Sequence, residues 1–265
     1  MIEVRNVFKN FNEHRVLDGI NLTIPDGKTY VIIGRSGGGK SVLLKHIEGI
    51  MKPDSGEVIV NGVNVSKCSE KELNALRLKI GMVFQGGALF DSLTVAENVG
   101  FGLIEHQRMQ GKELLERVEE SLCMVNLCGI GNLMPSELSG GMRKRVALAR
   151  ALCIKPDMII YDEPTTGVDP ITADSINVLI KELHDKLKVT SIVVTHDMRS
   201  AYKVADRIAM LYKGKIIAEG TPEEVQSTDN AVVHQFINGL ADGPITETLE
   251  PRSVLDKTQK INICP

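Results

Sequence analysis

Residues 30–41 read YVIIGRSGGGKS. The first four residues are an uninterrupted apolar run, which predicts a strand buried on both faces of a parallel sheet. The next eight match the pattern G-x-x-x-x-G-K-[ST], and a helical pattern follows them. The sequence therefore predicts a strand, a glycine-rich turn and a helix whose N-terminus binds a phosphate group.

The residue types in this turn indicate which ligand it binds. The glycines let the backbone wrap a phosphate with its N–H groups pointing inward. Lys40 is placed to reach the β- and γ-phosphates of a nucleotide, and the hydroxyl of Ser41 is placed to ligate Mg²⁺. The expected nucleotide contacts are Gly34, Arg35, Ser36, Gly37, Gly38, Gly39, Lys40, Ser41 and Val42.

Two further apolar runs, Met158–Tyr161 and Ser191–Thr195, predict parallel strands of the same sheet. Asp162 and Glu163 close the first run. We expect Asp162 to hold Mg²⁺ and Glu163 to orient and deprotonate an attacking water. The core is therefore predicted to be α/β with a parallel sheet.

A second anion site is predicted at residues 138–142, which read LSGGM. Ser139 suits the N-cap of a helix, and the two glycines after it expose several backbone amides. This site lies about 100 residues along the chain from Lys40. The charged run Arg143–Arg145 that follows is interpreted as a solvated helix face.

Additions surround this core. Asn61-Gly62 and Lys213-Gly214 predict antiparallel hairpins at a sheet edge. Residues 86–150 are predicted to form an inserted helical subdomain, in which Thr94 and Glu97 make a capping box. The core with this insertion is expected to span residues 1–240, and residues 241–265 are expected to be a polar tail.

The composition of the 265 residues excludes several classes of protein. A hydrophobic share of 43% and a net charge of -3 exclude a disordered chain and a basic nucleic-acid binder. The five cysteines include no C-x-x-C pair, so we expect a reduced, cytosolic chain without a disulfide framework or a zinc site. No apolar stretch is long enough to span a bilayer, so any link to a membrane must run through a partner.

Residues 138–142 resemble the LSGGQ signature of the ATP-binding-cassette (ABC) ATPases, with Met142 in place of Gln. The resemblance covers about residues 2–238 and implies roles for other residues in family order. Phe11 would stack on adenine, and Gln85 would contact Mg²⁺ and take part in catalysis. Asp169 would form the D-loop, and His196 would contact the γ-phosphate as a catalytic residue.

The family's mechanism implies that the chain works as a homodimer. Two copies would sandwich two ATP molecules, and each site would pair Lys40, Asp162 and Glu163 of one chain with Ser139–Gly141 of the other. Ser139, Gly140 and Gly141 are therefore expected to bind the partner's nucleotide. Met142 lacks the amide of Gln, but we expect activity because the serine and the glycine amides supply the phosphate contacts. Val42 stands where Thr is commonest in the family.

Residues 34–42, 89–99 and 138–150 are similar to the Mla-type lipid-transport ATPases of bacterial envelopes and their chloroplast relatives. This resemblance implies a peripheral subunit at the cytoplasmic face of the inner membrane. Its implied partners are an integral membrane permease, contacted near residues 85–99 through Leu89, Phe90 and Leu93, and a lipid-binding substrate protein. An ATPase for import of a small polar solute such as an amino acid stays open as the alternative.

Overall fold

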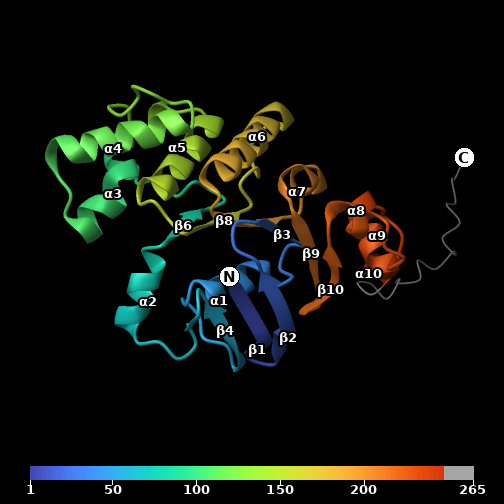
Figure 1. Cartoon of the computed structure of the whole chain (residues 1–265). Helices are drawn as coiled ribbons and strands as arrows, with labels where there is room; N and C mark the ends of the chain where they lie inside the picture. The colour runs from blue at the N-terminus through green and yellow to red at the C-terminus, as the bar shows by residue number, and fades with distance from the viewer. Residues whose placement is uncertain (248–265) are drawn as a thin grey trace, which may run out of the picture.

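The structure is a computed structural model that describes residues 1–247 (Figure 1). The predicted tail extends beyond that range, and its residues 248–265 lie outside the described part. At its start, α10 (Pro244–Glu247) follows α8 (Pro222–Gln226) and α9 (Ala231–Asn238). The amide of Ile245 donates to Oε1 of Gln235 at 2.8 Å, so α10 is tied to α9.

Among the described residues, six strands form the central sheet, in the order β10-β9-β3-β8-β7-β6. They are β3 (Thr29–Ile33), β6 (Ile80–Val83), β7 (Met158–Asp162), β8 (Thr190–Thr195), β9 (Arg207–Tyr212) and β10 (Lys215–Gly220). All neighbours pair in parallel except β9 and β10. The three strands predicted from apolar runs are confirmed and lie side by side, which brings their carboxyl ends to one edge.

An antiparallel sheet packs against this parallel one, with the order β2-β1-β4-β5. Its strands are β1 (Ile2–Phe11), β2 (His14–Ile24), β4 (Ser55–Val60) and β5 (Val63–Asn64). The hairpin at Asn61-Gly62 is confirmed, and both residues have positive φ, 50° and 80°. Its expected place at a sheet edge is confirmed, because β5 is the edge strand of this antiparallel sheet and β4 pairs with β1. The other hairpin ends at an edge of the parallel sheet, with β10.

Helix α1 (Lys40–Ile47) carries the chain from β3 into the space between the sheets. Its Leu43 and Ile47 are buried in one hydrophobic cluster with residues such as Val4 of β1 and Ile32 of β3. Because this cluster holds α1 from both sides, the turn before the helix is fixed at its two ends.

The other face of the parallel sheet is covered by helices (Figure 1). They are α3 (Val95–Gln107), α4 (Gly111–Met124), α5 (Gly140–Cys153), α6 (Pro170–Leu187) and α7 (Met198–Val204), while α2 (Glu70–Arg77) precedes β6. The capping box of α3 is confirmed: the Thr94 amide donates to Glu97 Oε2 at 2.7 Å. Within residues 1–247, we find no helix both long and apolar enough to cross a bilayer.

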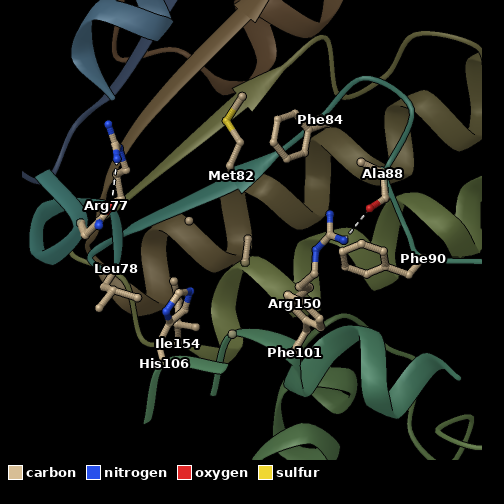
Figure 2. A pocket seen from close by; sticks show the side chains of 14 residues that line it. Arg77, Leu78, Met82, Phe84, Ala88, Phe90, Phe101, His106, Arg150 and Ile154 are labelled. Atoms are coloured by element: carbon tan, nitrogen blue, oxygen red, sulfur yellow. Dashed lines mark hydrogen bonds between the residues drawn. The ribbon is translucent and has the colours of Figure 1, made fainter. Parts of the chain in front are cut away.

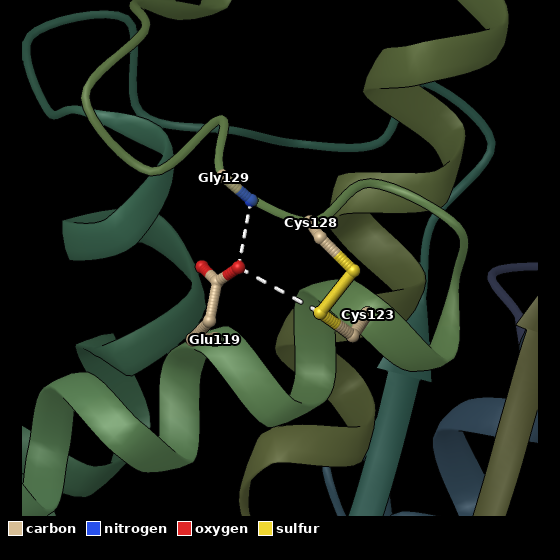
Figure 3. Close-up of a disulfide and its surroundings, with 4 residues drawn as sticks. All are labelled: Glu119, Cys123, Cys128 and Gly129. Carbon is tan, nitrogen blue, oxygen red and sulfur yellow. Dashed lines mark hydrogen bonds between the residues drawn. A yellow bond between two sulfur atoms is a disulfide. The ribbon is translucent and has the colours of Figure 1, made fainter.

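The expectation of a reduced chain is wrong, because Cys123 and Cys128 are bonded to each other (Figure 3). Helix α4 ends at Met124, and the chain then turns back, which brings the two Cα atoms to 4.4 Å. Oε1 of Glu119, one turn earlier on α4, accepts from the Gly129 amide at 2.7 Å. Of the other described cysteines, Cys68 and Cys153 are free thiols.

Candidate active site

The glycine-rich turn lies between β3 and α1 and needs glycine at particular positions. Gly34 has a φ of +151°, and a Cβ there would lie 2.3 Å from the carbonyl oxygen of Leu211. Gly39 has a φ of +100° and precedes the first residue of α1. Gly34 has no room for a side chain, and Gly39 has a backbone conformation that favours glycine. The turn therefore directs backbone amides and the positive end of α1 at one site.

Lys40 supplies the charge of this site. Its side chain is 6% exposed, and its Nζ donates to the carbonyls of Gly34 at 2.7 Å and Arg35 at 3.0 Å. Burial lowers the pKa of Lys40, an effect that the carboxylates of Glu163 and Asp162 oppose. A buried ammonium group beside inward-facing amides matches the charge of the β- and γ-phosphates.

Glu163 is held at the end of β7 in an unusual conformation. Its φ is 52°, and its amide donates to the Val194 carbonyl at 2.9 Å. The carboxylate accepts from the hydroxyls of Thr166 at 3.2 Å and Thr195 at 3.4 Å, and lies 2.9 Å from His196 Nδ1. Non-glycine residues adopt positive φ only where surrounding contacts hold them, often at functional sites. The result is a positioned carboxylate beside Lys40, suited to act as a general base.

Asp162 and Ser41 provide oxygen ligands at the same edge of the sheet. Ser41 Oγ lies 3.5 Å from Asp162 Oδ2. Burial raises the pKa of Asp162, and the negative charge of neighbouring Glu163 raises it further. Hydroxyl and carboxylate oxygens are the ligands that Mg²⁺ prefers, and a divalent cation would offset the charge of these neighbouring carboxylates. The two residues therefore fit a magnesium ion.

A separate cluster gathers the predicted signature residues. Ser139 caps α5 by accepting from the Met142 amide at 3.2 Å, and Asp169 caps α6 by accepting from the amides of Ile171 and Thr172 at 3.0 Å. A Cβ on Gly141 would lie 2.7 Å from Thr172 Cγ2, so the start of α5 packs tightly on the start of α6. The structure thus brings Asp169 next to the signature, on elements distinct from those that carry Lys40.

The remaining predicted nucleotide contacts are placed differently. A cavity of about 500 Å³ beside the turn is lined by Arg15 and Val16, by residues 35–38 and by residues 211–214. Phe11 is 43% exposed and is not among the lining residues, so its contact with adenine stays a prediction. Sequence reasoning missed Arg15 and Val16, which carry no motif. Val42 packs against the hydrophobic core rather than facing the cavity.

The interpretation of residues 143–145 as a solvated face holds for Arg143, which is exposed, but is wrong for buried Lys144 and half-buried Arg145. Lys144 is 8% exposed, and its Nζ donates to the carbonyl of Gln85. Arg143 donates to the Leu138 carbonyl at 2.9 Å, and Arg145 to Ser175 Oγ at 2.7 Å. Charge alone does not predict these contacts, because the burial of α5 depends on the elements that pack around it.

An apolar groove of about 660 Å³ lies between β6, α3 and α5 (Figure 2). Phe84, Phe90 and Phe101 line it, and the ring centres of Phe90 and Phe101 are 4.8 Å apart. Leu89 instead packs against the hydrophobic core, and neither Leu89 nor Leu93 lines the groove. Of the three apolar residues expected to contact a partner, only Phe90 is placed to do so here.

Three features define a nucleotide-hydrolysing cassette. They are the phosphate-binding turn after β3, the acidic pair at the end of β7 and the separate signature at the start of α5. The sequence pattern of the ABC transporter family matches residues 17–166, more than half of the chain. The chain belongs to this family. It is an ATPase, and its cofactors are ATP and Mg²⁺.

Individual proteins resemble the chain over most of its length. Protein TRIGALACTOSYLDIACYLGLYCEROL 3, chloroplastic, from Arabidopsis thaliana is 43% identical, covering 92% of this chain and 75% of the relative. The intermembrane phospholipid transport system ATP-binding protein MlaF of Haemophilus influenzae is 42% identical, covering 92% and 93%. Among solved structures, the dimeric cassette MJ0796 bound to ADP and Pi is 37% identical, with a TM-score of 0.76 over 84% of this chain and 99% of that one.

Proposed function

We propose that the chain is the ATP-hydrolysing subunit of a membrane transporter that moves phospholipid or a related lipid in the cell envelope. The observation that carries this proposal is the identity of more than 40% to MlaF and to the chloroplast relative, over 92% of the chain. The site described above supplies the ATPase chemistry. The names of the two relatives supply the class of substrate.

The chain's own residues account for the chemical step. Lys40 and the amides of the turn bind the β- and γ-phosphates and offset charge that develops during transfer. Glu163 accepts a proton from the attacking water, held in place by the threonine hydroxyls and His196. Ser41 and Asp162 would hold Mg²⁺, which neutralises phosphate charge when bound, and Gln85 is proposed to approach it from the loop after β6.

The working form is proposed to be a homodimer. One chain carries the Lys40 cluster and the Ser139 cluster on different elements, and each cluster offers amides to an anion. A dimer in which each chain's Ser139–Gly141 faces the partner's ATP uses both clusters at once. The similarity to a dimeric cassette bound to ADP and Pi supports this arrangement.

The apolar groove is proposed as the contact for an integral membrane permease. Phe84 and Phe90 are 44% and 45% exposed, and Arg150 lines the groove together with them and Phe101. Such a groove suits an amphipathic segment, because a few aromatic anchors carry most of the energy of such contacts. The chain would then be a peripheral subunit at the cytoplasmic face of the inner membrane, with a lipid-binding substrate protein as a further partner.

The ATPase assignment is tested by Glu163→Gln. Removing a positioned general base costs about 10²–10⁴-fold in turnover, while the contacts that bind ATP remain. We expect steady-state hydrolysis to be nearly abolished and the affinity for Mg-ATP to be retained in a direct binding assay. Turnover within about threefold of the unchanged chain would contradict the role of Glu163 as the base.

The permease contact is tested by Phe90→Asp. A carboxylate in the groove should sharply reduce the amount of chain that co-purifies with membranes and leave the basal ATPase rate of the purified chain close to normal. Leu115→Asp is the matched control, since Leu115 is 61% exposed on α4 outside the groove. Equal loss of membrane recovery in both variants would argue against this groove.

The lipid substrate needs a separate experiment. Cells depleted of the chain should show an altered distribution of phospholipid in the envelope and normal uptake of amino acids. Mass spectrometry of lipids in the purified complex would identify the species that it carries. Normal lipid distribution with impaired amino-acid uptake would favour the alternative importer.

A further inference from the structure

Lys144 is a buried charge to which ATP binding and hydrolysis assign no role. It lies on α5, one turn after Gly140, and its ammonium group donates to the backbone carbonyl of Gln85. Burial lowers the pKa of Lys144, and the charge of Glu163 opposes this shift. Because a buried ammonium is costly unless it is hydrogen-bonded, this lysine holds the Gln85 backbone firmly to α5.

Arg150, further along α5, holds the next part of the same loop. Its Nη2 donates to the Gly87 carbonyl at 2.7 Å, and its Nη1 to the Ala88 carbonyl at 2.6 Å (Figure 2). Lys144 and Arg150, here called the α5 clamp, therefore bind the loop at residues 85, 87 and 88. Two long, positively charged side chains on one helix thus fix the loop that carries Gln85 and borders the apolar groove.

The clamped loop is strained. Gly87 and Ala88 have φ values of +76° and +47°. Glycine adopts this region without cost, but Ala88 has a Cβ and does not. A strained residue persists only where its surroundings hold it, and Arg150 bonds the carbonyls on both sides of the Ala88 amide. Without the clamp, Ala88 would be expected to relax to a more favourable backbone conformation.

The same helix carries the signature at its other end. Ser139 caps α5, and the helix is buried on nearly every side from Lys144 to Cys153. Lys144 lies about 6 Å along the axis from Gly140. A shift of the signature is therefore transmitted to the clamp by a rigid element rather than through a flexible connection.

We propose that the α5 clamp couples the two ATP sites of the dimer. When Ser139–Gly141 of one chain close on the partner's ATP, α5 moves, and Lys144 and Arg150 carry that movement to Gln85–Ala88 of their own site. Lys144 and Arg150 are thus positioning residues, since they act through Gln85. This inference rests on the homodimer of the proposed function.

The first experiment measures the rate of ATP hydrolysis against ATP concentration. With two coupled sites, we expect a Hill coefficient between about 1.5 and 2 for the unchanged chain and about 1 for Lys144→Met. Maximal turnover of Lys144→Met should fall about threefold to thirtyfold, while the affinity for ATP in a binding assay is unchanged. Lys144→Arg should restore both quantities. Lys181→Met, at an exposed lysine of α6, is the matched control and should behave like the unchanged chain.

A second experiment keeps the positive charge at position 150 and removes the two-pronged guanidinium group. Arg150→Lys cannot hold two neighbouring carbonyls in the same geometry, so we expect a similar loss of turnover and of cooperativity. Glycine adopts the backbone conformation of residue 88 without strain, so the loop of Ala88→Gly needs Arg150 less to keep its shape. Adding Ala88→Gly to Arg150→Lys should therefore recover at least about half of the lost turnover on a logarithmic scale. If Arg150 only stabilised the fold, Ala88→Gly would not rescue turnover. The single variant Ala88→Gly completes the double-mutant cycle.

The outcomes separate this inference from the function on which it rests. If Glu163→Gln stays monomeric in Mg-ATP, the homodimer itself is wrong. If the dimer forms but the unchanged chain shows a Hill coefficient of about 1, or Lys144→Met keeps that of the unchanged chain, the clamp does not couple the sites. Failure of Ala88→Gly to rescue Arg150→Lys would equally overturn the role given to strain.

Discussion

Glu48 follows α1 and is 7% exposed, and burial together with the nearby charge of Asp162 raises its pKa to about 7. Its ordinary value is 4.5, so the folded chain binds this proton more tightly than the unfolded chain. Folding stability should therefore fall as the pH rises from about 4.5 to about 7 and then stay level. At neutral pH, the ionised carboxylate is a cost to the fold.

We predict that Glu48→Gln raises the free energy of unfolding at pH 8 by up to about 3 kcal/mol, because the amide has no charge to bury. The gain should vanish below pH about 4.5, where both states of the original carboxyl are protonated. Denaturant unfolding at the two pH values measures it. Glu105→Gln, at an exposed position of α3, should give no gain at either pH. An equal gain at both pH values for Glu48→Gln would contradict the raised pKa.

At the scale of single residues, sequence reasoning located Lys40, Asp162 and Glu163 because each belongs to a motif with a chemical meaning. It misplaced Lys144, since a lysine between two arginines is typical of a solvated face. It also had no means of finding Glu48, whose burial depends on how α1 packs between the sheets. Motifs report the groups that touch a ligand, whereas burial reports the tertiary structure around them.

The loop between β6 and α3 depends on one buried amide. Asn98 is fully buried, and its Nδ2 donates to the carbonyls of Phe90, Leu93 and Thr94 at 3.0 Å. Its Oδ1 accepts from the Phe90 amide at 2.7 Å. The side chain thus shapes the segment that presents Phe90 to the groove, since its two N–H groups are shared among three backbone carbonyls and its oxygen accepts a backbone amide.

We predict that Asn98→Ala lowers the free energy of unfolding by about 2–3 kcal/mol, because it leaves buried backbone groups without a partner. Asn98→Asp should be at least as damaging, since a carboxylate oxygen would face backbone carbonyls. Chemical denaturation measures both effects, and Asn238→Ala on the exposed face of α9 provides the control. A loss for Asn98→Ala no larger than that for Asn238→Ala would show that the loop keeps its shape without this amide.

At the scale of elements, prediction succeeded where the local signal was strong. Apolar runs located β3, β7 and β8, and Thr94 with Glu97 marked the start of α3. Strand β6 was missed because residues 80–83 are few and include Gly81, where a Cβ would lie 2.8 Å from the Ala151 carbonyl. The sheet that β4 joins could not be predicted, since pairing with β1 is a long-range choice that a hairpin turn does not encode.

In the proposed homodimer, the whole molecule would carry half of each of two composite sites, which a mixing experiment can test. Ser139→Arg places bulk and charge where the partner's phosphate would lie, and Lys40→Ala removes the phosphate-binding ammonium. Each variant alone should be nearly inactive. A mixture of the two should regain partial activity, because one composite site of the mixed dimer carries both changes and the other carries neither.

The measurement is the ATPase rate of the mixture compared with those of the two parents, with mixed dimers verified by differently tagged chains. Activity no greater than that of the parents, in the presence of such dimers, would contradict cross-chain sharing. A mixture of Lys40→Ala with Glu163→Gln is the matched control. Both changes there lie in the same cluster, so every composite site stays damaged and no activity should return.

The general architecture was within reach of sequence reasoning because each phosphate-handling motif lies at a strand or helix end whose type could be predicted. The separation of Lys40 and Ser139 along the chain also indicated two anion sites. The contacts between the start of α5 and the start of α6 were beyond it, because packing of Gly141 on Thr172 depends on how two helices cross over the sheet. Sequence order indicates the parts, and their distances come from the packed core.

The bond between Cys123 and Cys128 closes a small covalent ring on the surface of the helical insertion. A protease that cuts the peptide bond between Asn126 and Leu127 would produce two polypeptides that still migrate as one species in a denaturing gel without reductant. Only treatment with a thiol reductant would release the N-terminal and C-terminal pieces. The backbone could thus be opened between the Lys40 and Ser139 regions while a sulfur–sulfur link keeps both halves in a single molecule.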